Sequence, residues 1–183
     1  MKLKSIVLLS LFLSITSLLN AQKYLTQSGT ITFFSETPME NIDAVNNQVS
    51  SVLNAENGEL AFSLLMKAFV FEKALMQEHF NEKYVESPKF PKSTFKGTIS
   101  SFDLSKLSDS STEFPVKGKL TIHGVTKEVS AVMKISKSGE KINANSKFTI
   151  NLDDFDIKIP AAVKDNISKT IDIKVKLDYE KVG

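Results

Sequence analysis

Apolar and polar residues alternate along most of the chain, as expected for β-strands that have one buried and one exposed face. In residues 170–179, Ile171, Ile173, Val175, Leu177 and Tyr179 face one way, and polar or charged side chains face the other way. The same period-2 pattern occurs in residues 31–33, 49–53, 60–68, 95–99, 114–122, 129–135 and 142–152. The pattern predicts a mainly β protein with seven or eight strands.

Residues that favour turns separate these segments. Asn57-Gly58 predicts a hairpin between residues 49–53 and 60–69, and Gly124 and Ser138-Gly139 predict the next two turns. Short turns make neighbouring strands antiparallel. A sheet with one apolar face is buried most economically when it closes on itself, which also removes exposed edges. We therefore expect a single antiparallel β-barrel of about eight strands, although periodicity alone does not exclude a two-sheet sandwich.

One segment departs from the strand pattern. In residues 71–84 the apolar residues recur at intervals of three or four positions, which is typical of an amphipathic helix. Pro88 and Pro91 end it. We expect this helix to cover one open end of the barrel. Residues 37–48 fit either irregular chain or a short helix.

The N-terminus has the features of an export signal. Two lysines precede a 14-residue apolar run, residues 6–19, and Ala21 supplies a small residue before the expected cleavage point. That run is shorter than the roughly 20 residues that a membrane-spanning helix needs. Residues 1–21 are therefore predicted to be a signal peptide and residues 22–183 the folded domain. The mature protein would be periplasmic or secreted, with no stable membrane anchor.

Charge and composition narrow the function further. The chain has 23 basic residues, all lysine, and 21 acidic residues. Because Lys2 and Lys4 lie in the predicted signal peptide, the mature domain is electrically neutral. Nucleic acids and anionic membranes both require clustered positive charge, so neither is an expected partner. The absence of cysteine excludes disulfides, thiolate catalysis and cysteine-ligated metals.

The remaining reactive side chains are few. His79 and Glu82 are three residues apart on the predicted helix, but a zinc site needs three or four ligands and the second histidine, His123, is distant in sequence. The acidic run at residues 153–156 lacks the glycine and glutamate of a calcium-binding EF-hand loop. No nucleophile elbow or phosphate-binding loop is present. We predict no metal, no cofactor and no catalytic residues.

The apolar, inward-facing surface of the predicted barrel is the remaining candidate site. An eight-stranded barrel is either just filled by its own side chains or wide enough to hold one small ligand, and composition leaves both interpretations open. A hollow interior would bind a long apolar chain, because each buried methylene contributes roughly 0.8 kcal/mol. The predicted lining consists of Phe33, Phe62, Leu64, Met66, Phe80, Phe95, Leu120, Ile122, Met133, Ile135, Phe148 and Ile150.

Several motifs resemble those of a known family. Residues 120–129 (LTIHGVTKEV) are similar to the signature hairpin of the YceI-like family of exported lipid-binding proteins. Residues 78–95 resemble the helix-to-strand passage of that family. Residues 31–33 and 154–157 resemble its first and penultimate strands. The similarity spans about residues 29–180.

The resemblance implies a lipocalin-like barrel that holds an amphiphile, such as a polyisoprenoid or a fatty-acid derivative, and it carries over no catalytic residues. Five residues match motif positions of the family, and we assign them a role in the fold in preference to a role in ligand contact. They are His79, Pro91, Phe95, His123 and Gly124. Residues 40–52 depart from the family pattern, because they are longer and more polar than its usual entry into the second strand.

Three hypotheses follow. We favour a non-catalytic lipid binder, and the alternative is a structural or interaction module of the cell envelope with a filled core. The third hypothesis is a hydrolase or isomerase that uses His79 or His123. The sequence does not distinguish a monomer from a homodimer.

Overall fold

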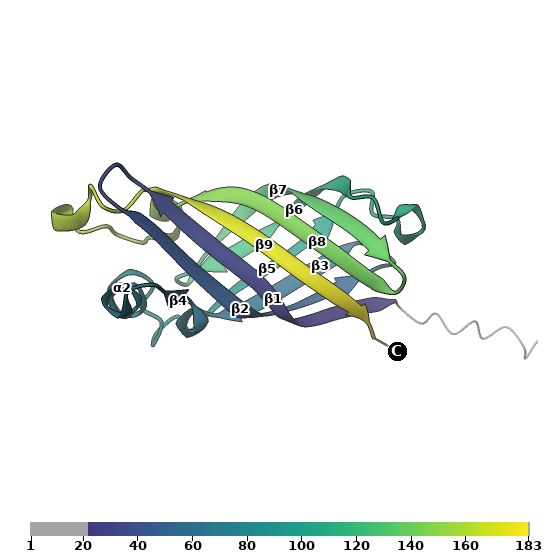
Figure 1. The fold of residues 1–183 in the computed structure, drawn as a ribbon, viewed down its shortest axis with the longest axis horizontal. Coiled ribbons are helices and arrows are strands. Elements are labelled where there is room, and N and C mark those ends of the chain that lie inside the picture. The colour runs from purple at the N-terminus through teal and green to yellow at the C-terminus, as the bar shows by residue number, and fades with distance from the viewer. Residues whose placement is uncertain (1–21, 183) are drawn as a thin grey trace, which may run out of the picture.

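The computed structural model describes residues 22–182, which form a closed antiparallel β-barrel (Figure 1). The signal-peptide prediction lies outside the described residues. The eight barrel strands run in the order β1-β9-β8-β7-β6-β5-β3-β2, and pairing of β1 with β2 closes the ring. The predicted barrel is thus confirmed, and the sandwich is excluded. The strands are β1 (Lys23–Glu36), β2 (Asn41–Asn54), β3 (Glu59–Leu65), β5 (Lys92–Ile99), β6 (Thr112–Ile122), β7 (Val125–Ser138), β8 (Lys141–Asn151) and β9 (Thr170–Lys181).

The three predicted turns are confirmed, and each contains a residue in the left-handed region of backbone space. Gly58 has φ 71° between β2 and β3, and Gly139 has φ 59° between β7 and β8. Between β6 and β7, His123 and Gly124 have φ 51° and 75°. Two consecutive positive φ values in a two-residue loop define a type I′ turn, whose twist matches that of the strands it joins.

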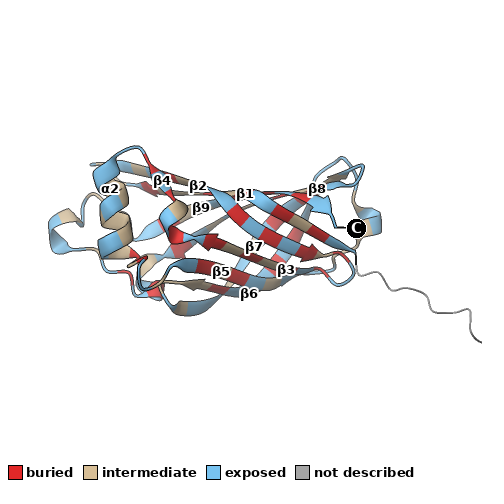
Figure 2. Ribbon diagram, turned by 90° about the horizontal axis from the view of Figure 1, so that it is seen from below, coloured by how far each residue is buried: buried red, intermediate tan, exposed pale blue. Residues whose placement is uncertain are grey.

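Alternation along the strands separates the interior from the surface as predicted. On β9, the apolar residues at 171, 175, 177 and 179 are buried, and the lysines between them are exposed. Red and blue bands alternate along the strands in Figure 2 for the same reason. The core therefore occupies the bore of the barrel.

Residues 37–48 are mostly strand, so the expectation of irregular chain or a short helix is wrong. Strand β2 begins at Asn41, and only residues 37–40 form the turn that precedes it. The alternation is disguised because Asn46 is an inward-facing polar residue that is completely buried. Its amide donates to the Leu65 carbonyl at 2.9 Å and accepts from the Gln48 backbone N–H at 2.8 Å. A fully hydrogen-bonded amide can occupy an interior strand position that the sequence pattern assigns to the surface.

The apolar row at residues 60–69 was predicted to be one continuous strand, and this is wrong. Strand β3 ends at Leu65, a 3₁₀ turn, η1 (Met66–Ala68), follows, and the short β4 (Val70–Phe71) pairs with β2. The break turns the chain across the end of the barrel. As a result, the rings of Phe69 and Phe71 both pack against Phe33 of β1, with centroids 5.3 and 5.5 Å away.

The predicted helix at residues 71–84 is shorter than expected and divided. Helix α2 (Ala74–His79) begins after Lys73, whose backbone is extended, and a π-helical turn, η2 (Phe80–Tyr84), continues it. Phe71 already belongs to β4, which delays the start of the helix. Leu75 was expected on the apolar stripe but is 60% exposed, whereas Met76, Phe80 and Tyr84 pack against the core. The helix covers one end of the barrel, as predicted (Figure 1).

Residues 154–157 resemble a family strand in sequence but do not form one here. Strand β8 ends at Asn151, and the 3₁₀ turn η4 (Leu152–Phe155) follows. The Asn151 side chain accepts a hydrogen bond from the Asp153 backbone N–H, and Asp156 has φ 55°. These features turn the chain away from the sheet. Two further 3₁₀ turns are η3 (Leu104–Lys106) and η5 (Ala161–Val163), and η5 lies in the long connection between β8 and β9.

Candidate functional site

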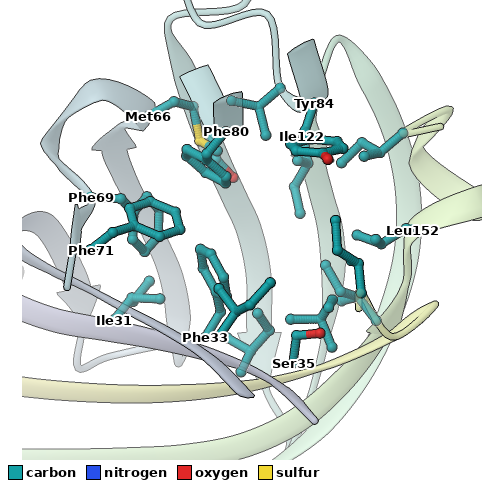
Figure 3. Close-up of a pocket in the computed structure, with 18 of the residues that line it drawn as sticks. Ile31, Phe33, Ser35, Met66, Phe69, Phe71, Phe80, Tyr84, Ile122 and Leu152 are labelled. Atoms are coloured by element: carbon teal, nitrogen blue, oxygen red, sulfur yellow. The ribbon is translucent and has the colours of Figure 1, made fainter. Parts of the chain in front are cut away.

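The barrel contains an apolar cavity of about 280 Å³ in the half that lies next to α2 (Figure 3). This volume is just below the usual range of ligand sites, roughly 300–1,000 Å³. Inward-facing residues of seven barrel strands, all except β7, form its wall. They include Ile31, Phe33, Phe62, Leu64, Leu120, Ile122, Phe148, Ile150, Ile171 and Ile173.

The structure brings nine of the twelve predicted lining residues to this cavity, namely Phe33, Phe62, Leu64, Met66, Phe80, Leu120, Ile122, Phe148 and Ile150. Phe95, Met133 and Ile135 do not line it, although all three are buried. They point into the bore as their alternation requires, but Met133 and Ile135 lie in its other half, and Phe95, which stacks on Phe62, lies at the boundary between the two halves. Alternation determines which face a residue occupies, whereas the position along the barrel axis depends on strand register.

Phe95 shows why that half of the bore is filled. Its ring stacks on Phe62 with centroids 5.1 Å apart, and it lies over Gly97 and Gly118, which pair across β5 and β6. A Cβ atom at Gly97 or Gly118 would come within 2.5 or 2.6 Å of the tip of that ring. The two glycines make room for the ring, which backs the Phe62 side of the cavity.

Beyond Phe95 the bore is occupied by buried side chains. Met133 and Ile135 of β7 are buried opposite Phe114 and Thr112 of β6. Tyr179 is 1% exposed, and its hydroxyl lies 2.7 Å from Ser51 Oγ. One half of the barrel is therefore an ordinary packed core, and the other half is hollow.

Residues 66–85, which we call the α2 lid, cover the cavity. Four aromatic rings meet there, with centroid separations between 5.0 and 5.6 Å. They belong to Phe33 on the wall and to Phe69, Phe71 and Phe80 on the lid, as Figure 3 shows. Neither Phe69 nor Phe71 was predicted to line the cavity, because Phe69 was assigned to a continuous strand over residues 60–69 and Phe71 to the helix over residues 71–84. The signal that was available is the dense Phe-Val-Phe sequence directly before the helix.

The β8–β9 loop, residues 152–169, forms the other part of the cover. Its apolar residues Leu152, Ile157, Val163 and Ile167 line the cavity. Leu152 ends the period-2 run of residues 142–152, whereas Ile157, Val163 and Ile167 follow no strand or helix period that would place them there. Their isolated positions among charged residues were the only indication.

Few polar groups face the cavity, and several are already hydrogen-bonded within the protein. Ser93 Oγ donates to the Thr121 carbonyl at 2.9 Å. Ser35 Oγ accepts from the backbone N–H of Ser168 at 2.9 Å, which fixes the β8–β9 loop to β1. Among the described residues that line the cavity there is no lysine, and Glu40 is the one carboxylate.

Glu40 connects the two parts of the cover. Its Oε1 lies 2.7 Å from Lys73 Nζ, at the start of α2, and its Oε2 accepts from Asn166 Nδ2 of the β8–β9 loop at 3.4 Å. The hydrogen bond from the Lys73 ammonium holds the pKa of the Glu40 carboxyl below its ordinary value. Glu40 is therefore ionised at neutral pH, at the mouth of the cavity.

The two histidines have different surroundings. His79 is partly buried and lines the cavity. His123 lies outside the lining, with Nδ1 3.1 Å from the Phe155 carbonyl and Nε2 2.8 Å from Glu86 Oε2. The hydrogen bond from His123 lowers the pKa of the Glu86 carboxyl. This arrangement joins the β6–β7 turn to η4 and to Glu86, which directly follows the α2 lid, as a structural connection would.

Within residues 22–182, no three histidine or acidic side chains gather closely enough to form a metal site. In the same part of the chain, no helix has both the length and the apolar character to cross a bilayer.

Comparison with known proteins identifies the family. The YceI-like domain model matches residues 20–179, which is nearly the whole chain. This chain belongs to the YceI-like family. The resemblance noted in the hairpin at residues 120–129 is thereby confirmed.

One sequence relative and two solved structures are similar to this chain. A UPF0312 protein of Pseudomonas putida strain W619 is 31% identical over 101 residues, covering 52% of this chain and 47% of the relative, so the match spans about half of each. A polyisoprenoid-binding domain from Saccharophagus degradans superposes with a TM-score of 0.76 at 14% identity, over 87% of this chain and 98% of that domain. BcnA of Burkholderia cenocepacia gives a TM-score of 0.69 at 15% identity, over 82% and 95% of the two chains.

Proposed function

We propose that this YceI-like protein is an exported, non-catalytic binding protein that holds one amphiphilic lipid by its apolar chain. The observation that carries the proposal is a cavity of about 280 Å³ whose wall and cover are almost entirely aliphatic and aromatic. The expected ligand is a polyisoprenoid or a fatty-acid derivative. The Saccharophagus degradans neighbour, described as a polyisoprenoid-binding domain, supports this ligand class.

The energetics favour a long chain. Burial of about ten methylenes contributes about 8 kcal/mol. That offsets much of the association cost, which is about 4–15 kcal/mol. A short or polar molecule gains too little in such a cavity, because it buries less apolar surface.

The polar groups of the site support binding without catalysis. Ser35 and Ser93 are held in hydrogen bonds with the backbone, and Glu40 joins the two parts of the cover. His123 is engaged with Glu86 and Phe155 outside the cavity. These side chains organise the cavity, and the proposal assigns them no chemical step.

Export is part of the proposal and rests on residues 1–21. Intact-mass measurement of protein from the secreted or periplasmic fraction tests it, because cleavage after Ala21 leaves Gln22 as the first residue. Recovery of the uncleaved chain in the cytoplasm would contradict export.

Native mass spectrometry of the purified protein tests lipid binding. We expect one lipid per chain, either carried from the cell or taken up from added prenyl or acyl compounds. The same spectra report whether the protein is a monomer or a homodimer. A cavity that stays empty with every compound, together with a stable complex with another envelope protein, would instead favour an interaction module.

A further inference from the structure

The described residues that line the cavity include a negatively charged side chain but no lysine. The chain contains 23 lysines, yet among residues 22–182 none lines the cavity. Glu40 supplies a carboxylate there, and the other polar lining groups are Ser35, His79, Tyr84, Ser93 and Asn166. A charged or polar head group at the mouth would therefore meet a carboxylate and no lysine of the lining.

The geometry of Glu40 leaves it able to bind a donor. Its side chain is 25% exposed, so it is partly removed from water. A carboxylate has about four acceptor sites. Lys73 and Asn166 occupy two of them, at 2.7 and 3.4 Å. The remaining sites can accept hydrogen bonds from a ligand that reaches the mouth.

We propose that Glu40 determines head-group selectivity, so that the cavity takes lipids with an uncharged, hydrogen-bond-donating head, such as a primary alcohol, and rejects lipids with an anionic head. An alcohol can donate to the free acceptor sites of Glu40. A carboxylate or phosphate would lie beside a like charge in a partly dehydrated site, which is unfavourable. Lys73 does not reverse this preference, because it is 62% exposed and already paired with Glu40. This inference rests on the proposed lipid-binding function.

Two chain-matched ligands test the proposal, namely farnesol and farnesyl phosphate. Their dissociation constants are measured by displacement of an apolar fluorescent probe at pH 8, where an imidazole is ordinarily neutral. We expect the native protein to bind farnesol at least about tenfold more tightly than farnesyl phosphate.

Two variants separate electrostatic selectivity from a structural role. Glu40→Gln removes the negative charge and keeps the shape, so the preference for farnesol should shrink. Lys73→Gln leaves the Glu40 carboxylate without its partner, so the preference should grow. Asp43→Asn is the matched control: it removes one negative charge three residues along the chain, on β2, but Asp43 is exposed and outside the lining, so the preference should not change.

Each outcome has a defined meaning. Both Glu40→Gln and Lys73→Gln break the same ion pair, so a shift of the preference in the same direction in both would show that Glu40 only holds the cover, and would overturn the proposal. Equal binding of the two ligands by the native protein would overturn it while leaving lipid binding intact. Failure of both ligands to bind would overturn the proposed function as well. Urea unfolding curves confirm that each variant is folded.

Discussion

At the scale of single residues, a few side chains divide the bore into a filled and a hollow half. Gly97 and Gly118 have no Cβ atoms where the Phe95 ring lies, and that ring in turn supports Phe62. Sequence alternation predicted that Phe95 faces inward. It could not show that two glycines on adjacent strands create the space for the ring, because their pairing depends on the register of β5 and β6.

Substitution of Gly118 by alanine should destabilise the barrel. The new Cβ would lie 2.6 Å from the Phe95 ring and 2.5 Å from the Lys96 carbonyl oxygen. We expect a loss of about 1–3 kcal/mol in the free energy of unfolding, measured in urea. Gly139→Ala is the control, since its Cβ would meet no atom within 4 Å and it tests only the cost of φ 59°. An equal loss in both variants would contradict the packing role of Gly118.

Tyr179 should make the stability of the filled half sensitive to alkaline pH. Ser51 Oγ donates to the Ala61 carbonyl, so the Tyr179 hydroxyl is the donor in the buried contact with Ser51. Burial raises the pKa of Tyr179 well above its ordinary value. Because the phenol ionises more easily in the unfolded chain, its contribution to stability is complete below about pH 10 and is lost as the pH rises further.

Tyr179→Phe tests this effect. At neutral pH the variant should lose about 0.5–1.5 kcal/mol of unfolding free energy with the hydrogen bond. Above pH 10 the native protein should lose stability faster than the variant, so the difference between the two should narrow in urea titrations. A constant difference across this pH range would contradict the role of Tyr179.

At the scale of elements, the α2 lid shows how tertiary contacts modify a periodic pattern. The spacing of apolar residues correctly predicted a helix over one end of the barrel. It did not predict that β4 would take Phe71 into a pairing with β2, or that the helix would continue as a π-helical turn. As a result, Leu75 is exposed while Phe80 joins the aromatic cluster of the cavity.

Phe80→Ala should weaken lipid binding. The ring contacts Phe33, Phe69 and Phe71, and its loss removes apolar surface from the cavity and loosens the lid. We expect the affinity for an apolar fluorescent probe to fall by roughly tenfold, about 1.4 kcal/mol. Leu75→Ala on the same helix is the control, since that side chain is 60% exposed and outside the lining. Equal effects of the two variants would mean that the lid acts only through helix stability.

At the scale of the whole molecule, the interior of the barrel is part packed core and part cavity. Eight-stranded barrels are usually either filled by their own side chains or hollow enough to hold one small ligand. The C-terminal end of β9 lies at the end of the barrel opposite α2 (Figure 1). Buried side chains such as Tyr179 fill the bore on that side, and the cavity lies under the α2 lid. The filled half would limit how far a bound chain can extend. The packed half also buries much of the apolar core, so the stability of the fold does not depend on close packing around the cavity.

Chain-length dependence of binding should reveal this limit. For a series of primary alcohols, the binding free energy should become more favourable by about 0.8 kcal/mol per methylene and then level off once the cavity is full. Phe95→Ala should move the plateau to longer chains, because it opens the space below Phe62. Met133→Ala, buried outside the lining, should lower stability without moving the plateau. Affinity that rises without limit would show that the chain does not end at the filled half.

The sequence by itself determined the class of fold, the antiparallel turns, most of the inward-facing residues and the family, because alternation, turn chemistry and short motifs are local properties of the chain. Only the tertiary structure decided where along the axis each inward residue lies, which half is hollow, and which residues of the α2 lid and the β8–β9 loop cover the cavity. These features depend on strand register and on contacts between distant segments, such as those of Glu40 with Lys73 and Asn166. No period within a single segment encodes such contacts.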